Sequence, residues 1–299
     1  MKLVLKTVES RQGLIWLQQG VAVFGRQPLA LTGLFGTFLF MALLLLLLPV
    51  VGGLVVLAAI PLLGLVMMMG TAAAVRGQPV LPSLFLAPLR TEPLRRRRLL
   101  ALCGLYGAAS LLVMALSDLA DGGKLDALQE LMAAGGDSDQ ARDRLQALMQ
   151  DPQLRSGLYL RLTLTALMAL PFWHAPALVW WGQQGVAQSM FSSLIALWRC
   201  RGAFLLYVAG WFALISVLSL GLGFVLQALD ASRFIGVLAM PLAMTLSVMF
   251  YASLYFMFVQ TFGAGAKNGA EADDEADGGD GGELETTYAP PKPPINPPA

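Results

Sequence analysis

Six long runs of apolar residues, almost free of charge, organise the chain. They occupy residues 29–51, 54–75, 99–116, 158–181, 204–229 and 235–262. A helix needs about 20 predominantly apolar residues to cross the roughly 30 Å hydrocarbon core of a bilayer. The pattern therefore predicts an all-α fold, a polytopic membrane helical bundle with about six transmembrane helices and the lipid bilayer around it.

The composition supports this prediction. Hydrophobic residues make up 57% of the chain and charged residues 13%, whereas roughly 25% of the residues in an average soluble domain are charged. The two cysteines, Cys103 and Cys200, form no paired framework, so we expect both to stay reduced. No cleavage site for a signal peptide follows the charged residues of 1–13, so we expect the start of the chain to be retained.

The basic residues are distributed unevenly between the connections. With the N-terminus inside, the cytoplasmic segments hold 14 of the 20 Lys and Arg residues. Short loops rich in Lys and Arg stay on the cytoplasmic side, which predicts a bacterial inner (cytoplasmic) membrane protein with both termini cytoplasmic. The strongest anchors are Arg95, Arg96, Arg97, Arg98, Arg199 and Arg201. These arginines are either determinants of topology or a site for anionic lipid headgroups.

Amphipathic segments precede several of the spans. In 10–27, four apolar residues share one face of a helical wheel, and these are Leu14, Leu17, Val21 and Phe24. Such a helix lies in the headgroup plane, so we expect an interfacial helix within a cytoplasmic N-terminus of 1–28, with Trp16 at the interface. The basic cytoplasmic loop 76–98 contains a similar segment, and 183–201 is predicted to form another interfacial helix.

These segments give the chain a repeated plan of one amphipathic helix followed by two spans, in units near 10–75, 82–181 and 183–262. Internal repeats are common in transporters, whose binding sites lie between the repeats. Gene duplication also produces such repeats in membrane proteins without transport activity. The first two apolar segments of the three in 29–116 are long enough for two crossings, and a re-entrant hairpin is the alternative for that pair.

Two segments outside the spans have a composition of their own. Residues 117–157 contain eight acidic and four basic residues, and two short amphipathic stretches with glycine and proline stops predict an extracytoplasmic acidic helical hairpin. The segment lacks the ligand spacing of a calcium loop. Residues 263–299, after the spans of 158–262, are rich in Gly and acidic residues and then in Pro. This composition predicts a disordered cytoplasmic tail.

The fourth apolar segment contains the only histidine of the chain, His174, between Pro171 and Pro176. A proline removes a backbone donor and kinks a helix, which frees carbonyl groups near His174. An ionisable residue inside a membrane segment indicates a functional site, and an imidazole can relay protons. The alternative is a neutral imidazole bonded to a freed carbonyl or to a neighbouring helix. The candidate functional residues are His174, Trp173, Pro176 and Arg161.

Signatures of soluble catalysis are absent from the sequence. It contains no Gly-rich phosphate loop, no nucleophile elbow and no pair of metal-binding histidines. A lone histidine cannot supply the three or four ligands of a zinc site. We therefore expect no enzymatic activity, no cofactor, no bound metal and no nucleic-acid partner.

Four stretches carry a resemblance to a known family. They are RQGLIW at 11–16, RQPLALTG at 26–33, FWHAPAL at 172–178 and WRCRGAF at 198–204. They resemble the signature stretches of an uncharacterised family of proteobacterial multi-pass inner-membrane proteins, and the Phe-Trp-His-Ala-Pro-Ala motif is the most specific part. More distantly, the chain is similar to the membrane domain that accompanies some glycerophosphodiester phosphodiesterases, without their catalytic domain. The resemblance implies membrane placement and no particular activity.

Two functions agree with these features. The first is a non-enzymatic scaffold or accessory subunit of a membrane protein complex, with the acidic hairpin and the tail as exposed attachment points. The second is a transporter of a small molecule or a lipid, with a site around the kinked fourth span at His174. The absence of charged pairs in the spans favours the first, whereas the repeats and the kink favour the second.

Overall fold

The computed structural model of the chain describes residues 3–49, 51–133, 139–231 and 234–264. Its helices are α1 Gln12–Arg26, α2 Pro28–Leu46, α3 Val51–Ala58, α4 Ile60–Val75, α5 Ala87–Arg90, α6 Pro93–Asp121, α7 Lys124–Ala133, α8 Asp139–Gln150, α9 Pro152–Phe172, α10 Ala175–Gly182, α11 Val186–Arg199, α12 Arg201–Ala228 and α13 Ile235–Thr261. A 3-10 helix, η1 Pro82–Leu86, precedes α5, and the two strands are β1 Leu3–Leu5 and β2 Phe262–Ala264. The all-α class predicted from the sequence is confirmed.

Five described helical segments are long and apolar enough to cross a membrane. They are Pro28–Leu46, Pro93–Asp121, Pro152–Gly182, Arg201–Ala228 and Ile235–Thr261. The pair α3 and α4 passes the same test together, with a bend of 44° between the two helices. Pro61 lies in the first turn of α4, and because proline has no N–H, it interrupts the hydrogen-bond ladder at this bend. Five to six candidate spans agree with the predicted polytopic helical bundle.

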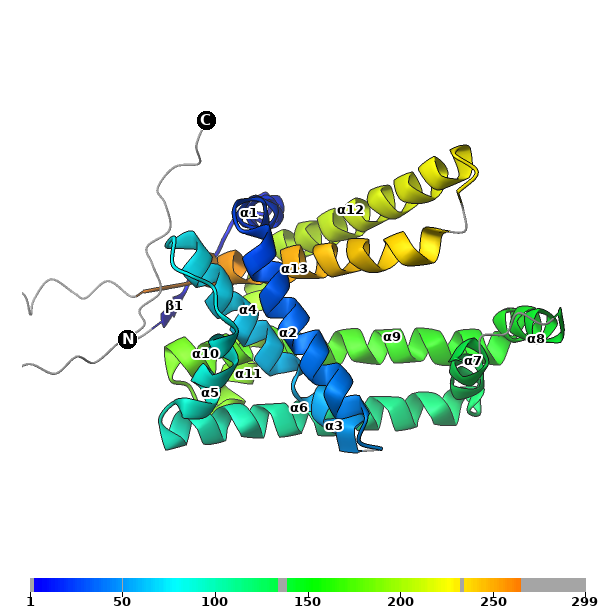
Figure 1. Ribbon diagram of the computed structural model, residues 1–299. Helices are drawn as coiled ribbons and strands as arrows, with labels where there is room; N and C mark the ends of the chain where they lie inside the picture. Colours follow the sequence, from blue (N-terminus) through cyan, green and yellow to red (C-terminus); the bar gives the residue numbers. More distant parts are fainter. Residues whose placement is uncertain (1–2, 50, 134–138, 232–233, 265–299) are drawn as a thin grey trace, which may run out of the picture.

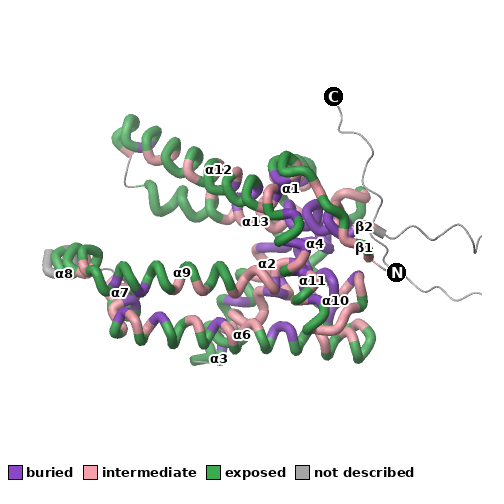
Figure 2. Tube along the Cα trace, turned by 180° about the vertical axis from the view of Figure 1, so that it is seen from behind, coloured by how far each residue is buried: buried purple, intermediate pink, exposed green. Residues whose placement is uncertain are grey.

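Two long helical hairpins, α6–α9 and α12–α13, extend in the same direction from one end of the bundle (Figure 1). The helices α1, α10 and α11 and the β1–β2 sheet lie at that end, whereas α7 and α8 lie at the far end of the α6–α9 hairpin. Buried residues gather near the first end and around α4 (Figure 2). The far halves of both hairpins are therefore largely exposed to the surroundings of the protein.

The β1–β2 sheet joins the two ends of the described chain. The strands are antiparallel, and Leu3 pairs with Ala264, while Leu5 pairs with Phe262. The backbone N–H of Lys6 donates to the carbonyl of Thr261 at 2.8 Å, which continues the ladder toward α13. The first two residues of the predicted tail, 263 and 264, thus belong to a strand, and the rest of the tail, 265–299, lies outside the described residues.

Helix α1 packs on α12 and α13 through a face that includes two glycines. A Cβ atom added to Gly13 would lie 2.0 Å from the carbonyl oxygen of Ala203, and one added to Gly20 would lie 2.6 Å from the Cβ of Ser253. The helix backbones therefore approach each other closely only because these positions carry no side chain. The buried residues of α1 are Gly13, Trp16, Gly20 and Val23.

This packing corrects the expectation that Trp16 lies at the membrane interface. Trp16 is 1% exposed, and its indole N–H donates to Oε1 of Gln260 on α13 at 2.6 Å. The predicted apolar face is rotated by about one residue from the buried one, since Leu14 is 42% exposed. The helical wheel predicted the wrong buried face of α1, because a glycine contributes nothing to apolar periodicity but permits the closest contact between helices.

The segment 117–157, predicted as an acidic hairpin, contains α7 and α8 together with the ends of two membrane helices. Helix α6 continues to Asp121 and ends at Gly122, whose φ of 67° is the left-handed conformation that favours glycine at a helix end. Helix α9 begins at Pro152 after Asp151, whose carboxylate caps the helix by accepting from the N–H of Gln153. The membrane helices therefore extend further than hydropathy alone predicted.

Candidate functional site at the helix break

The span that contains His174 is broken into α9 and α10. Helix α9 ends at Phe172, and Pro176 lies in the first turn of α10. Because Pro176 has no N–H and its ring crowds the preceding turn, the α9 ladder stops here and a new helix starts. The kink predicted from the two prolines is thus present, and Trp173 and His174 lie at the break.

Ser193 of helix α11 bridges this break. Its hydroxyl accepts a hydrogen bond from the backbone N–H of His174 at 3.1 Å and donates to the carbonyl of Leu170 at 2.9 Å. In an unbroken helix these two backbone groups would bond to each other, since residue i bonds to residue i−4. The side chain of α11 therefore satisfies both groups inside the bundle, where an unpaired polar group is costly.

The His174 side chain faces aromatic rings of α13 and β2. It is 1% exposed, and its ring centroid lies 6.1 Å from that of Phe258 and 5.5 Å from that of Phe262. Its Nδ1 atom has no hydrogen-bond partner among the described residues. The freed carbonyl of Leu170 is occupied by Ser193 instead, so among the described residues neither that carbonyl nor a hydrogen bond at Nδ1 gives His174 a partner for proton exchange.

Trp173 points to a different side of the break from His174. Its indole N–H contacts the sulfur of Met257 at 3.2 Å, and its ring packs edge-on against Phe204 at 5.1 Å. Trp173 and Pro176 both line a cavity of about 180 Å³ between α4, α6, the α9–α10 break and α13. We call this space the inner cavity. The structure thus brings two of the four candidate residues to one cavity.

A larger cavity of about 670 Å³ lies between α12 and α13. The two helices diverge toward their connection (Figures 1 and 2), and small residues such as Gly223 and Ala239 line the space between them. We call this space the outer cleft. Sequence analysis missed it, although the small residues of both helices were a weak signal that a gap between them would stay open.

Phe250 and Tyr251 line both the outer cleft and the inner cavity. Their ring centroids lie 5.6 Å apart at an interplanar angle of 77°. The Phe250 ring also packs edge-on against Trp173 at 6.0 Å and against Trp211 at 5.7 Å. One pair of aromatic residues on α13 therefore separates the two cavities.

Arg161 lies apart from this site. It precedes His174 by 13 residues along the same span, which is about 20 Å at the helical rise of 1.5 Å per residue. It lines neither the inner cavity nor the outer cleft. The structure therefore does not group Arg161 with the other three candidate residues.

The arginine run at the start of α6 has two different surroundings. Arg95 lies over the ring of Trp180 at 5.4 Å, and Arg98 donates to the carbonyl of Gln183 at 2.6 Å. Two of the four arginines thus attach α6 to the end of α10. Arg96 donates to the carbonyl of Leu89 at 3.4 Å, and its side chain and that of Arg97 are exposed to headgroups or solvent.

The two arginines at the junction of α11 and α12 are exposed as well. Arg199 and Arg201 flank the buried Cys200, and Arg201 lies over the ring of Trp198 at 5.6 Å. Trp198 is 73% exposed. An exposed aromatic ring beside two cations is the arrangement found at the headgroup level of membranes.

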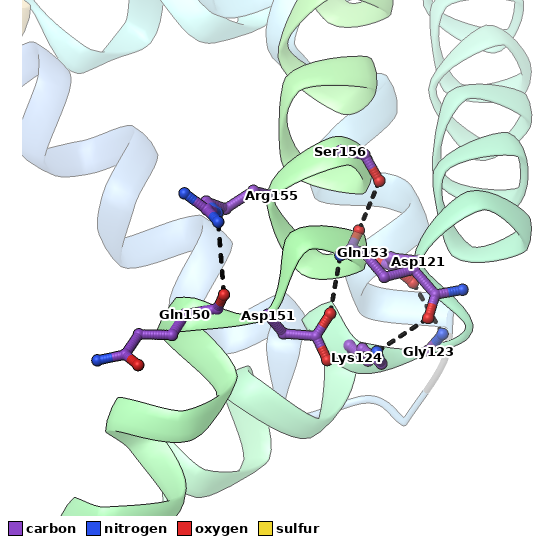
Figure 3. Close-up of polar contacts among 8 residues, drawn as sticks. All are labelled: Asp121, Gly123, Lys124, Gln150, Asp151, Gln153, Arg155 and Ser156. Carbon is purple, nitrogen blue, oxygen red and sulfur yellow. Dashed lines mark hydrogen bonds and ion pairs between the residues drawn. The ribbon is translucent and has the colours of Figure 1, made fainter.

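A polar cluster at the far end of the α6–α9 hairpin joins α7 to α9 (Figure 3). Lys124 contacts the carboxylate of Asp151 at 2.5 Å and the side-chain oxygen of Gln153 at 2.9 Å. The hydrogen bond from Lys124, together with the N–H of Gln153, lowers the pKa of Asp151 below its usual value. Within the described ranges, no group of three or more acidic, His or Cys side chains could hold a metal ion.

One known protein is similar to most of the chain. A protein of Burkholderia thailandensis named probable inner membrane protein is 34% identical over 257 residues, which cover 86% of this chain and 93% of that protein. No protein-family model and no solved structure matches the chain. The identity and the coverage show common descent, and the apolar helices of this chain agree with the relative's name. The chain therefore belongs to the family of this inner membrane protein and is itself a multi-pass protein of the inner membrane.

Proposed function

We propose that the protein binds an uncharged long-chain lipid in the outer cleft and transports it through the bundle. This proposal takes up the transporter alternative of the sequence analysis, but it places the first binding site between α12 and α13 and not at the kinked fourth span around His174. The observation that carries it is the cleft itself, a space of about 670 Å³ between two membrane helices whose described lining residues carry no charge. Its volume lies within the roughly 300–1,000 Å³ that is typical of ligand sites.

The surroundings of the cleft favour a lipid as its occupant. Ile215 and Ile235, which line it, are 44% and 46% exposed, so the cleft communicates with the medium around α12 and α13. In a bilayer that medium is the hydrocarbon of lipid chains. A gap of this size between two membrane helices would therefore be filled by an apolar chain.

The absence of charge favours a lipid with a neutral polar group. Among the residues that the structure describes, no Asp, Glu, Lys, Arg or His lines the outer cleft or the inner cavity. A charged group at this depth without a partner is strongly unfavourable. The hydroxyls of Ser219 and Ser247 are among the few polar groups of the cleft, and they can bond to a hydroxyl or an ester of the ligand.

The test uses the purified full chain in nanodiscs with two photoactivatable lipids, an uncharged diacylglycerol and an anionic phosphatidylglycerol. We expect diacylglycerol adducts on cleft residues of α12 and α13. Ala243→Trp fills the cleft and should lower these adducts about tenfold, the ratio that corresponds to about 1.4 kcal/mol of binding free energy. Val237→Trp is the matched control, because Val237 is 68% exposed on the same helix and lies outside the cleft. Equal labelling of the two variants would refute the proposal.

The orientation of the chain is part of the proposal. The excess of basic residues in its short connections supports cytoplasmic termini, which would place the end with α1, the sheet and α10 on the cytoplasmic side. The exposed side chains of Arg96, Arg97, Arg199 and Arg201 would then face the anionic headgroups of the inner leaflet. No catalytic step is proposed, and the distant likeness to the membrane domain of glycerophosphodiester phosphodiesterases carries no part of the argument.

A scaffold or accessory subunit is the second candidate function. The observation that favours it is a surface cavity of about 580 Å³ between α7 and α8, lined by charged residues of both signs, Glu130, Arg144 and Asp151. Extraction of the tagged chain in mild detergent, followed by mass spectrometry, tests for a partner. A stoichiometric protein that is lost when residues 125–150 are replaced by a short linker would support this function over transport. Unchanged protein composition would remove the hairpin as an attachment point.

A further inference from the structure

We infer that the inner cavity is a second binding position for the same uncharged lipid chain, and that Phe250 and Tyr251 form a movable partition between the two positions. This inference rests on the proposed function, since it follows the ligand beyond the outer cleft. It assigns a ligand class to Trp173 and Pro176, which line the inner cavity.

The residues that line the two cavities follow one another along α13. The outer cleft is lined on this helix from Ile235 to Tyr251, and the inner cavity is lined from Phe250 to Leu254. Successive turns of one helix therefore lead from the first cavity into the second. Phe250 and Tyr251 are the two residues that belong to both linings.

The two cavities have similar chemistry. The described residues that line the inner cavity have apolar and aromatic side chains, and none of them is acidic, basic or histidine. A lipid chain that is stable in the outer cleft loses no polar contact when its end enters the inner cavity, because neither cavity is lined by described charged residues that need a charged partner. At about 180 Å³, the inner cavity is much smaller than the cleft, so it can hold the end of a chain but not a whole lipid.

The partition between the two cavities consists of two side chains on one helix. Phe250 and Tyr251 are each partly exposed to these spaces, and their rings meet edge-on. Aromatic side chains change rotamer far faster than helices rearrange. A rotation of the Phe250 ring into the outer cleft, where space is present, would therefore open the route without moving the bundle.

The helix breaks around the inner cavity support the same route. Its walls include the bend between α3 and α4 at Ile60 and Pro61, and the α9–α10 break at Trp173 and Pro176. Broken membrane helices are tolerated where they are buried in protein or line a cavity. Two broken helices meet at the inner cavity, which is the arrangement expected of a binding position inside a bundle.

The test extends the photolabelling of the full chain in nanodiscs, with a photoactivatable diacylglycerol whose reactive group is at the chain end. Mass spectrometry measures adducts on Ala169 and Met68 of the inner cavity relative to adducts on Ala239 of the outer cleft. We expect Phe250→Ala to raise this ratio about fivefold, since a loss of one packed ring changes such equilibria by that order. Phe256→Ala is the matched control, because Phe256 is buried on the same helix and lines neither cavity.

The outcomes separate the inference from the proposed function. Labelling of Ala239 with an unchanged ratio in Phe250→Ala would overturn the partition while leaving binding in the cleft intact. Equal labelling of both cavities in the native chain would also overturn it, since no partition would then operate. Absence of labelling at Ala239 in every variant would refute the proposed function itself. A thermal unfolding curve for each variant shows whether a changed labelling ratio comes from a folding defect and not from an opened route.

Discussion

The Ser193 hydroxyl replaces, at His174, the backbone hydrogen bond that the helix break removes. It lies 3.1 Å from the His174 nitrogen and 2.9 Å from the Leu170 oxygen. Helix α11, which presents Phe191 and Trp198 outward with 64% and 73% exposure, is thereby attached to the interior of the bundle. A surface helix and a broken membrane span thus depend on each other through one side chain.

The first prediction is that Ser193→Ala destabilises the protein. The substitution leaves the His174 N–H and the Leu170 carbonyl without a partner in a buried place, which costs about 1–3 kcal/mol. Unfolding in detergent, followed by circular dichroism against denaturant concentration, measures the effect. Ser192→Ala is the control on the same helix, because Ser192 is only partly buried. Equal stability of the two variants would contradict the bridging role.

The second prediction compares two glycines of α1, Gly20, which is packed against α13, and Gly25, which is not. Gly20→Ala should loosen α1, because the new methyl group would lie 2.6 Å from the Cβ of Ser253 and 2.8 Å from the Met249 carbonyl oxygen, closer than packed atoms tolerate. Gly25→Ala has open space and should stabilise the helix by up to about 1 kcal/mol. Protection of the α1 amides in hydrogen exchange should therefore fall in the first variant and be kept or raised in the second.

The sequence predicts those features of the fold that depend on the length and hydrophobicity of a segment, but not those that depend on which residues meet at a helix contact. Six apolar runs were enough to predict the membrane bundle, because burying each run requires only length and the absence of charge. The face of α1 was not predictable from apolar periodicity, since its contact with α12 and α13 is made by Gly13 and Gly20. The end of α6 was misplaced as well, because helix propensity carries the helix past its apolar part to Gly122.

The candidate site was predictable only in part. Two prolines near a lone histidine were a sufficient signal for the break, since proline acts on its own backbone. The residues that contact the break come from distant parts of the chain. Ser193 of α11 bonds to His174, and Phe250 of α13 packs against Trp173. Long-range contacts of this kind leave no local pattern, so the sequence indicated His174, whereas the cavity lies on the Trp173 side.

The third prediction is a dependence of stability on pH through Asp151. Its pKa in the folded protein is lowered, chiefly by the hydrogen bond from Lys124. A depressed pKa adds stability at a pH above the unfolded value, usually 3.8, and this stability is lost as the pH falls below that value. Asp151→Asn should therefore be less stable than the native chain at about pH 6, and this difference should shrink toward about pH 3.

Thermal unfolding of the detergent-solubilised protein across this pH range measures the difference. The size of the effect is expected to be small, since the pair is close to solvent. Asp126→Asn is the control, because Asp126 lies in the first turn of α7 without a described contact to Lys124. A difference between Asp151→Asn and the native chain that stays constant with pH would contradict the lowered pKa of Asp151 in the folded protein.

The last prediction separates the roles of two neighbouring arginines. Arg98 donates to the Gln183 carbonyl at 2.6 Å, so Arg98→Ala should lower stability by about 1 kcal/mol or more, the usual contribution of such a bond. Arg97 is exposed, so Arg97→Ala should leave stability within about 0.5 kcal/mol of the native value.

In nanodiscs with anionic lipid, Arg97→Ala should instead weaken lipid retention by about 1 kcal/mol, because a basic residue near a membrane surface contributes that much. Native mass spectrometry measures the retained lipid and denaturant unfolding measures stability. The reverse pattern, with Arg97 stabilising the fold and Arg98 holding lipid, would show that the contact between Arg98 and Gln183 does not persist in the membrane.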